Sequence, residues 1–147
     1  MYYRQATGTD LEKIKSLLDS CKLPSADCEE HINNYFIVED KRDIIGVGGL
    51  EIMDSLGLIR SLAVKPEYRG QGVATKLYCL LEKRASDAGI TTLYLLTESA
   101  SRFFSRFGFE IQNNAKPPRA IANTKQFSRL CPSTAVLMIH SLDQQNI

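Results

Sequence analysis

What the sequence lacks already narrows the class of protein. No run of about 18 apolar residues occurs, and Met1 to Asp10 lacks the basic start and apolar stretch of a secretory signal, so neither a membrane span nor export is expected. The 18 basic residues are nearly balanced by 17 acidic ones, which argues against non-specific attraction to nucleic acid. We therefore expect a cytoplasmic protein whose partners include neither membranes nor nucleic acid.

The motifs of several common sites are missing as well. The four cysteines form no C-x-x-C pair and have no histidine at zinc-site spacing, so no metal is expected. The P-loop pattern and the G-x-G-x-x-G fingerprint are both absent, which disfavours ATP and dinucleotide cofactors. Because no repeat, low-complexity tract or linker interrupts the 147 residues, we expect one domain over residues 1–147.

The apolar patterning that is present predicts alternating strands and helices. A capping box at Thr9 and Glu12 predicts the start of the first helix. The segment around 28–33 could add a further helical turn. The expected strands are 2–6, 35–39, 44–51, 58–64, 91–96 and 134–140, and the expected helices begin at Thr9 and at about 72, 99 and 118.

The stretch from Ser61 to Lys76 carries the most specific chemistry. A strand ends there, a turn contains Arg69, Gly70 and Gly72, and a helix begins at once. Unpaired backbone N–H groups and the positive end of the helix dipole then meet at one place, which favours an anion such as a phosphate. The glycines alone have a second explanation, since a turn that needs positive φ also favours glycine.

Two motifs resemble those of a known family. Arg69-x-x-Gly72-x-Ala74, preceded by Ser61-Leu-Ala-Val64, resembles the acyl-CoA signature (Q/R-x-x-G-x-G/A) of the GNAT N-acetyltransferase superfamily. Ala100-x-x-Phe-Phe-x-x-Phe-Gly-Phe109 is similar to the family's A-x-x-F-Y-x-x-x-G-F segment. The resemblance implies a single-domain α/β fold of the α+β type, with a mixed, mostly antiparallel central sheet flanked by helices.

The same resemblance implies acetyl-CoA as cosubstrate. Backbone groups of Leu62 and Val64 would bond its pantetheine arm, and the turn would cradle its pyrophosphate. The cofactor-binding residues implied in this way are Leu62, Ala63, Val64, Arg69, Gly70, Gln71, Gly72, Val73, Ala74, Thr75 and Phe104.

A narrower resemblance concerns the acceptor. The chain is similar to the arsenic-resistance-associated subgroup of N-acetyltransferases in the segments Leu95–Glu98, Phe103-Phe104, Ala120-Ile121 and especially Gln126–Ala135. Members of the wider group are associated with small amino-acid-like acceptors, so the resemblance implies direct acetyl transfer to the amine of such a molecule. The alternatives are a CoA-binding sensor or interaction module without catalysis and a protein N-terminal acetyltransferase. Association of two copies into a homodimer is also considered.

The sequence departs from the family pattern at two positions. Phe104 stands where many members have a tyrosine that protonates the departing thiolate, and Thr97 stands where an asparagine is common. The proton must then come from another group or from solvent, which is tolerable because a thiol of pKa about 8.5 leaves readily. The missing tyrosine is what motivates the alternative without catalysis.

The remaining catalytic assignments are hypotheses about single side chains. Glu51, at the end of its predicted strand, is the first choice as general base, although it could instead pair with Arg60 across the sheet. Arg60 could hold an acceptor carboxylate bidentately. Strict alternation would place Arg60, Leu62 and Val64 on one face of the sheet.

Three further residues complete the predicted site. Glu98 is a substrate-binding residue and the reserve base, but a carboxylate also suits the start of the next helix. Cys131 and Ser133, in the loop before the last strand, could donate to the leaving thiolate; a buried small residue is the alternative for Cys131.

Overall fold

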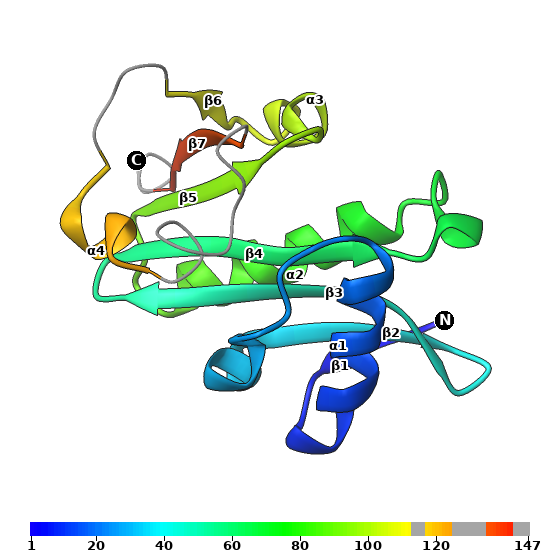
Figure 1. Cartoon of the computed structure of the whole chain (residues 1–147). Coiled ribbons are helices and arrows are strands. Elements are labelled where there is room, and N and C mark those ends of the chain that lie inside the picture. The colour runs from blue at the N-terminus through cyan, green and yellow to red at the C-terminus, as the bar shows by residue number, and fades with distance from the viewer. Residues whose placement is uncertain (113–116, 125–134, 143–147) are drawn as a thin grey trace.

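The computed structural model describes residues 1–112, 117–124 and 135–142. Within these ranges one sheet has the strand order β1-β2-β3-β4-β5-β7-β6 (Figure 1). Only β4 and β5 run parallel, so the sheet is mixed and mostly antiparallel, as expected. The strands are β1 (Tyr2–Gln5), β2 (Tyr35–Asp40), β3 (Asp43–Met53), β4 (Leu56–Val64), β5 (Thr92–Thr97), β6 (Glu110–Ile111) and β7 (Val136–Ser141).

Helices cover both faces of this sheet, and Figure 1 shows α1 in front of it and α2 behind. Ile14 and Leu18 of α1 pack on Ile37 and Val47, while the apolar stripe of α2 packs on the opposite face. Burying one such leucine or isoleucine side chain stabilises the fold by about 2 kcal/mol. The helical segments are η1 (Gly8–Asp10), α1 (Leu11–Ser20), η2 (Cys28–Asn34), η3 (Pro66–Tyr68), α2 (Val73–Asp87), α3 (Ser101–Ser105) and α4 (Arg119–Ala122).

The first helix begins differently from the sequence prediction. The predicted capping box at Thr9 and Glu12 is wrong, because the 3-10 turn η1 precedes α1 and moves the cap toward the N-terminus. The backbone N–H of Thr7 donates to the Asp10 carboxylate at 2.8 Å. Arg4 also donates to both oxygens of Asp10, at 2.9 and 2.8 Å, which ties this start to β1.

A β-bulge in β4 overturns the expected alternation. Val47 pairs with Ala63 and Gly49 pairs with Arg60, so Ser61 and Leu62 together stand opposite Gly48. The extra residue reverses the faces beyond it. Leu62 and Val64 pack on the α2 side, whereas the Arg60 side chain reaches Asp27 on the other side of the sheet.

The parallel pairing of β4 with β5 ends early. The paired residues run from Leu56↔Thr92 to Ile59↔Leu95, although both strands continue beyond them. Past this point the strands diverge, and the space between them is the main pocket of the described chain. None of the described helices is long and apolar enough to cross a bilayer.

Candidate active site

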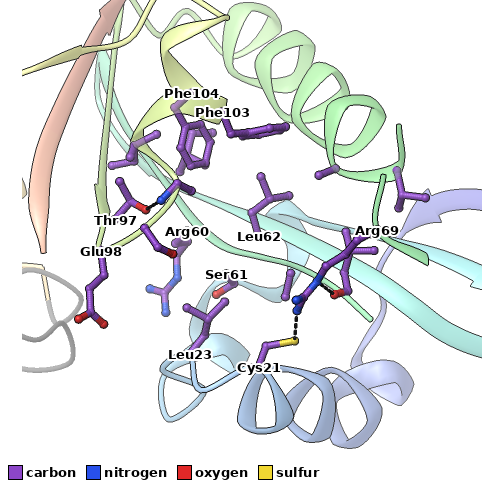
Figure 2. A pocket seen from close by; sticks show the side chains of 18 of the residues that line it. Cys21, Leu23, Arg60, Ser61, Leu62, Arg69, Thr97, Glu98, Phe103 and Phe104 are labelled. Atoms are coloured by element: carbon purple, nitrogen blue, oxygen red, sulfur yellow. Dashed lines mark hydrogen bonds between the residues drawn. The ribbon is translucent and has the colours of Figure 1, made fainter. Parts of the chain in front are cut away.

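The pocket between the diverging ends of β4 and β5 has a volume of about 820 Å³, within the range of about 300–1,000 Å³ usual for small-molecule sites. Its walls come from residues 21–24, from β4 beyond Ile59, from the turn before α2, and from the end of β5 with α3. Figure 2 shows Arg69 and Glu98 at opposite ends of this pocket, with Arg60, Ser61 and Leu62 between them.

The turn before α2 forms one end of the pocket. Gly70 and Gly72 have φ of +78° and +81°, a backbone conformation that favours glycine. A Cβ added at either position would meet nothing within 4 Å, so the space beside both residues is open. Because none of the described side chains caps the N-terminus of α2, its first N–H groups are available to an anion there. The geometry fits a phosphate group.

Few side chains of this turn are free to assist. Arg69 donates from Nε to the carbonyl of Val64 at 2.9 Å and from Nη2 to Cys21 Sγ at 3.8 Å, so it braces the turn against the strand. The Gln71 amide donates to the carbonyl of Glu67 at 3.4 Å, and Gln71 does not line the pocket. An anion at this end would therefore be bound mainly by backbone.

Most of the predicted cofactor residues do come together. Phe104, which is 6% exposed, supplies an apolar wall and packs edge-on against the neighbouring ring of Tyr78, with centroids 6.3 Å apart. The predicted cofactor residues that line the pocket are Leu62, Ala63, Val64, Arg69, Gly70, Gly72, Val73, Ala74, Thr75 and Phe104.

A buried charged cluster lies beside the other end of the pocket. The Arg60 side chain is fully buried. Its Nη1 donates to Asp27 Oδ2 at 2.8 Å and to Glu51 Oε1 at 3.0 Å, and its Nη2 donates to Asp27 Oδ1. Burial alone would raise the pKa of the Asp27 carboxyl, but the hydrogen bonds and charge of Arg60 outweigh it and hold that pKa below its ordinary value.

This cluster decides between two sequence hypotheses. The cross-strand pair of Glu51 and Arg60 is present, and Glu51 does not line the pocket. Both Nη atoms of Arg60 are taken, so a bidentate grip on an acceptor through them is not available. Arg60 Nε is buried and has no hydrogen-bond partner in the part of the chain that the structure describes. Sequence reasoning missed Asp27, whose only signal was the need of a buried arginine for a second counter-charge.

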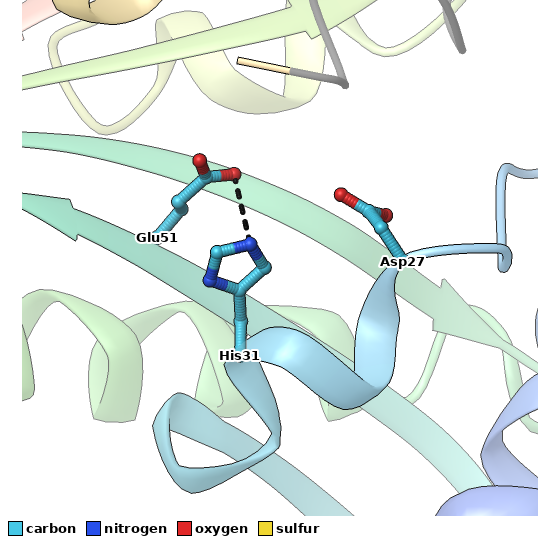
Figure 3. A group of neighbouring side chains, drawn as sticks. All are labelled: Asp27, His31 and Glu51. Carbon is cyan, nitrogen blue, oxygen red and sulfur yellow. Dashed lines mark ion pairs between the residues drawn. The ribbon is translucent and has the colours of Figure 1, made fainter.

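Asp27, His31 and Glu51 offer ligand atoms within 4.8 Å of one another (Figure 3). His31 Nε2 lies 3.5 Å from Glu51 Oε1. A metal ion would have to compete with the Arg60 guanidinium, which already pairs with both carboxylates. In the described structure Asp27 and Glu51 are thus the carboxylate partners of Arg60.

A family model described as the acetyltransferase (GNAT) domain matches residues 31–111, which is more than half of the 147 residues. The chain belongs to the GNAT acetyltransferase family. The match includes the bulged strand β4, the glycine turn, α2 and α3, which together form most of the pocket.

Sequence relatives within the GNAT family carry names that mention amino acids. The chain is 36% identical over 103 residues to an amino-acid acetyltransferase of Pseudomonas aeruginosa strain PAO1 and 37% identical over the same length to that of Pseudomonas syringae pv. tomato. Each match covers 69% of this chain. The chain itself spans only about a quarter (24%) of the length of these relatives.

Solved structures agree on the fold. Rv2747 from Mycobacterium tuberculosis, solved in complex with CoA, superposes with a TM-score of 0.81 at 21% identity, covering 97% of this chain and 99% of that one. N-acetylglutamate synthase from Neisseria gonorrhoeae, solved with coenzyme A and N-acetyl-glutamate, gives 0.79 at 22% identity, covering 96% of this chain and 35% of that one. At these identities the likeness establishes the fold alone.

The residues at which the sequence departs from the GNAT pattern have structural roles. Thr97 Oγ1 accepts a hydrogen bond from the Ala100 N–H at 2.9 Å and so fixes the turn into α3. The O–H of Tyr78 donates to Glu82 at 2.7 Å and does not line the pocket, so it does not replace the missing tyrosine at Phe104. Glu98 lines the pocket at the end of β5. Cys131 and Ser133 lie outside the described residues.

Proposed function

We propose that the chain transfers the acetyl group of acetyl-CoA to the amine of a small, amino-acid-like acceptor by direct attack. The observation that carries the proposal is a pocket with an open glycine turn at one end and the buried Arg60 cluster beside the other. The names of the sequence relatives support an amino-acid-like acceptor.

In this proposal the pyrophosphate of acetyl-CoA lies against the backbone of the Arg69–Thr75 turn, and the pantetheine arm follows Leu62 and Val64. Phe104 provides an apolar wall beside the thioester. CoA-bound structures of similar fold support this placement. The backbone N–H groups act where the negative charge of the phosphates is largest, so their contribution is electrostatic.

The acceptor then lies between Arg60 and Glu98. Arg60 Nε–H, a buried donor without a partner among the described residues, would bind one carboxylate oxygen of the acceptor. Glu98 replaces Glu51 as the proposed base because Glu98 lines the pocket and Glu51 is held by Arg60. Glu98 would remove the amine proton directly or through water. We propose that Glu51 serves by keeping Arg60 in place.

Acetyl transfer itself needs little more. The amine lone pair attacks the thioester carbonyl, the new C–N bond forms, and the C–S bond breaks to release the CoA thiolate. Cys131 or Ser133 remain proposed donors to that thiolate, with solvent as the other source. A thiolate with a parent pKa of about 8.5 is a good leaving group without a dedicated acid.

The test is acetyl-CoA consumption with a panel of acceptors. Free amino acids, amino-acid analogues that carry arsenic, polyamines and short peptides would each be scored for thiol release. We expect release with one or more amino-acid-like acceptors. Release only with peptides would favour protein N-terminal acetylation, and tight CoA binding with no release would favour a binding module. A chain that does not bind CoA contradicts the proposal.

The arsenic-containing arm tests the narrower resemblance to the arsenic-resistance subgroup. A cytoplasmic location and a homodimer are further predictions. Fractionation of cells that produce the protein would test the first, and sedimentation equilibrium would test the second.

A further inference from the structure

Ser61, at the bulge in β4, has a backbone conformation unusual for its residue type. Its φ is +58°, in the left-handed region that disfavours side chains other than glycine. Such a residue persists only when its surroundings hold it, and it often occurs where a site needs a particular backbone shape. The surroundings of Ser61 therefore need an explanation.

Tyr35 on β2 holds the Ser61 side chain. The two hydroxyl oxygens are 2.7 Å apart in a hydrogen bond, and Tyr35 is fully buried. The Tyr35 ring lies on Gly49, where an added Cβ would come within 2.4 Å of it. Gly49 pairs with Tyr35 on one side and with Arg60 on the other, so the ring crosses β3 to reach the bulge.

The burial of this hydroxyl pair keeps it in one protonation state. Desolvation raises the pKa of Tyr35 to about 12, so its O–H stays protonated at all ordinary pH values. An unpaired buried hydroxyl is costly, so Tyr35 and Ser61 each stabilise the position of the other. Titration of Tyr35 therefore does not break this hydrogen bond at ordinary pH.

The bulge decides on which face of the sheet the side chains beyond it lie. Beyond Ser61 the alternation is reversed, so that Leu62 and Val64 lie on the α2 side and line the pocket. A strand without the bulge would shift by one residue, so that each side chain beyond it would exchange faces and each peptide group would point to the opposite neighbouring strand. The conformation of Ser61 therefore sets the orientation of the β4 residues that are proposed to bind pantetheine.

We propose that Tyr35 is a positioning residue for the cosubstrate: its hydroxyl holds Ser61 in the left-handed conformation and thereby keeps Leu62 and Val64 on the α2 side of β4, where they line the pocket. This inference rests on the proposed binding of CoA along β4. Tyr35 does not line the pocket, so its effect would pass entirely through Ser61.

A matched pair of substitutions at one position isolates the effect. Ser61→Ala and Ser61→Gly both remove the hydroxyl, but only glycine adopts φ of +58° without strain. We expect Ser61→Gly to bind CoA within about twofold of wild type and Ser61→Ala to bind about tenfold more weakly, as the energy of the left-handed conformation implies. Isothermal titration calorimetry with CoA gives the affinities.

Tyr35→Phe tests the hydroxyl from the other side and changes one atom in the core. We expect CoA affinity to fall about fivefold, since Ser61 loses its hydrogen-bond partner while the bulge still requires it to adopt an unfavourable positive φ. The double variant Tyr35→Phe with Ser61→Gly should regain the affinity of Ser61→Gly. A merely structural tyrosine would lower the thermal midpoint of the free protein and leave CoA affinity unchanged in every background.

The outcomes separate this inference from the proposed function. Wild-type protein that does not bind CoA overturns both. Wild-type binding with equal affinities for Ser61→Ala and Ser61→Gly overturns the positioning role alone. If both variants instead lost kcat equally at saturating acetyl-CoA, with unchanged CoA affinity, the Ser61 hydroxyl would act in the acetyl-transfer step. That result would also overturn the positioning role.

Discussion

The two ends of the pocket are built from different materials. At the Gly70 and Gly72 end the surface is mainly backbone from one continuous segment. The side chains of Arg69 and Gln71 there donate hydrogen bonds to backbone carbonyls. At the Arg60 end the surface depends on charged side chains that come from β3, β4 and the start of η2. A backbone surface is sensitive to added bulk or charge, whereas a charged cluster is sensitive to the loss of any one member.

The largest effect should follow from breaking the charged end. Asp27→Ala would remove two charge-assisted hydrogen bonds from the buried Arg60 and leave Glu51 as its remaining carboxylate partner, and the free energy of unfolding should fall by about 3–5 kcal/mol. Urea unfolding followed by circular dichroism measures the loss. The triple variant Asp27→Ala, Glu51→Gln and Arg60→Met is the control, because removal of all three charges should recover most of the stability. Wild-type stability in Asp27→Ala alone would contradict the importance of the cluster.

A substitution at the glycine turn should instead lower CoA affinity and have little effect on stability. Gly72→Glu places a carboxylate in the open space beside the turn, where the pyrophosphate of CoA is proposed to lie. We expect CoA affinity to fall at least about 100-fold, because the carboxylate would clash with the phosphates and repel their negative charge. Gly72→Ala shares the strain at φ of +81° and should lose only about tenfold. Calorimetry gives both affinities, and unfolding of the free Gly72→Glu protein should stay close to that of Gly72→Ala. Similar affinities for the two variants would show that charge at this turn does not matter.

The proposed base gives a third contrast. Glu98→Gln should lower kcat by about 100-fold, the low end of general base catalysis, while the Kd for CoA is unchanged. Glu51→Gln keeps a hydrogen-bond acceptor for Arg60 and should mainly raise the KM for the acceptor. Steady-state kinetics on both variants, with CoA titrations alongside, decide which glutamate acts on the amine. The reverse pattern would return Glu51 to the role of base.

A smaller effect is expected at an ion pair away from both ends. Hydrogen bonds from Arg4 lower the pKa of Asp10 from 3.8 to about 2. Since the folded-state pKa is depressed, this pair stabilises the protein above the ordinary pKa, and the contribution is lost as pH falls from 3.8 toward 2. After allowance for the partly exposed Arg4, we expect about 1–2 kcal/mol. Asp10→Asn should flatten stability over this range of pH, and an unchanged slope would contradict the assignment.

The same difference between the two ends explains what the sequence could reveal. The glycine turn and the following helix are contiguous, so their pattern was sufficient to predict an open turn at the start of α2. The Arg60 cluster was only half predicted, because Asp27 lies 33 residues away in sequence and no local pattern links the two. Alternation failed at Ser61 because a bulge adds one residue without any change of hydropathy. The order of the strands along the chain followed from their periodicity and from the family resemblance, except for the two-residue β6, which is too short to give a periodic pattern.

The early end of the β4 and β5 pairing has a mechanical consequence for the whole molecule. A sheet that is joined only from Leu56↔Thr92 to Ile59↔Leu95 would be expected to open there as two halves. Helix α2 prevents this, since Tyr78 and Leu81 belong to one apolar cluster with Ile59 of β4 and Leu95 of β5. Helix α2 therefore holds β4 and β5 together across the gap between them. Heat or denaturant should unfold the protein in a single cooperative transition, with the cleft open throughout the folded state.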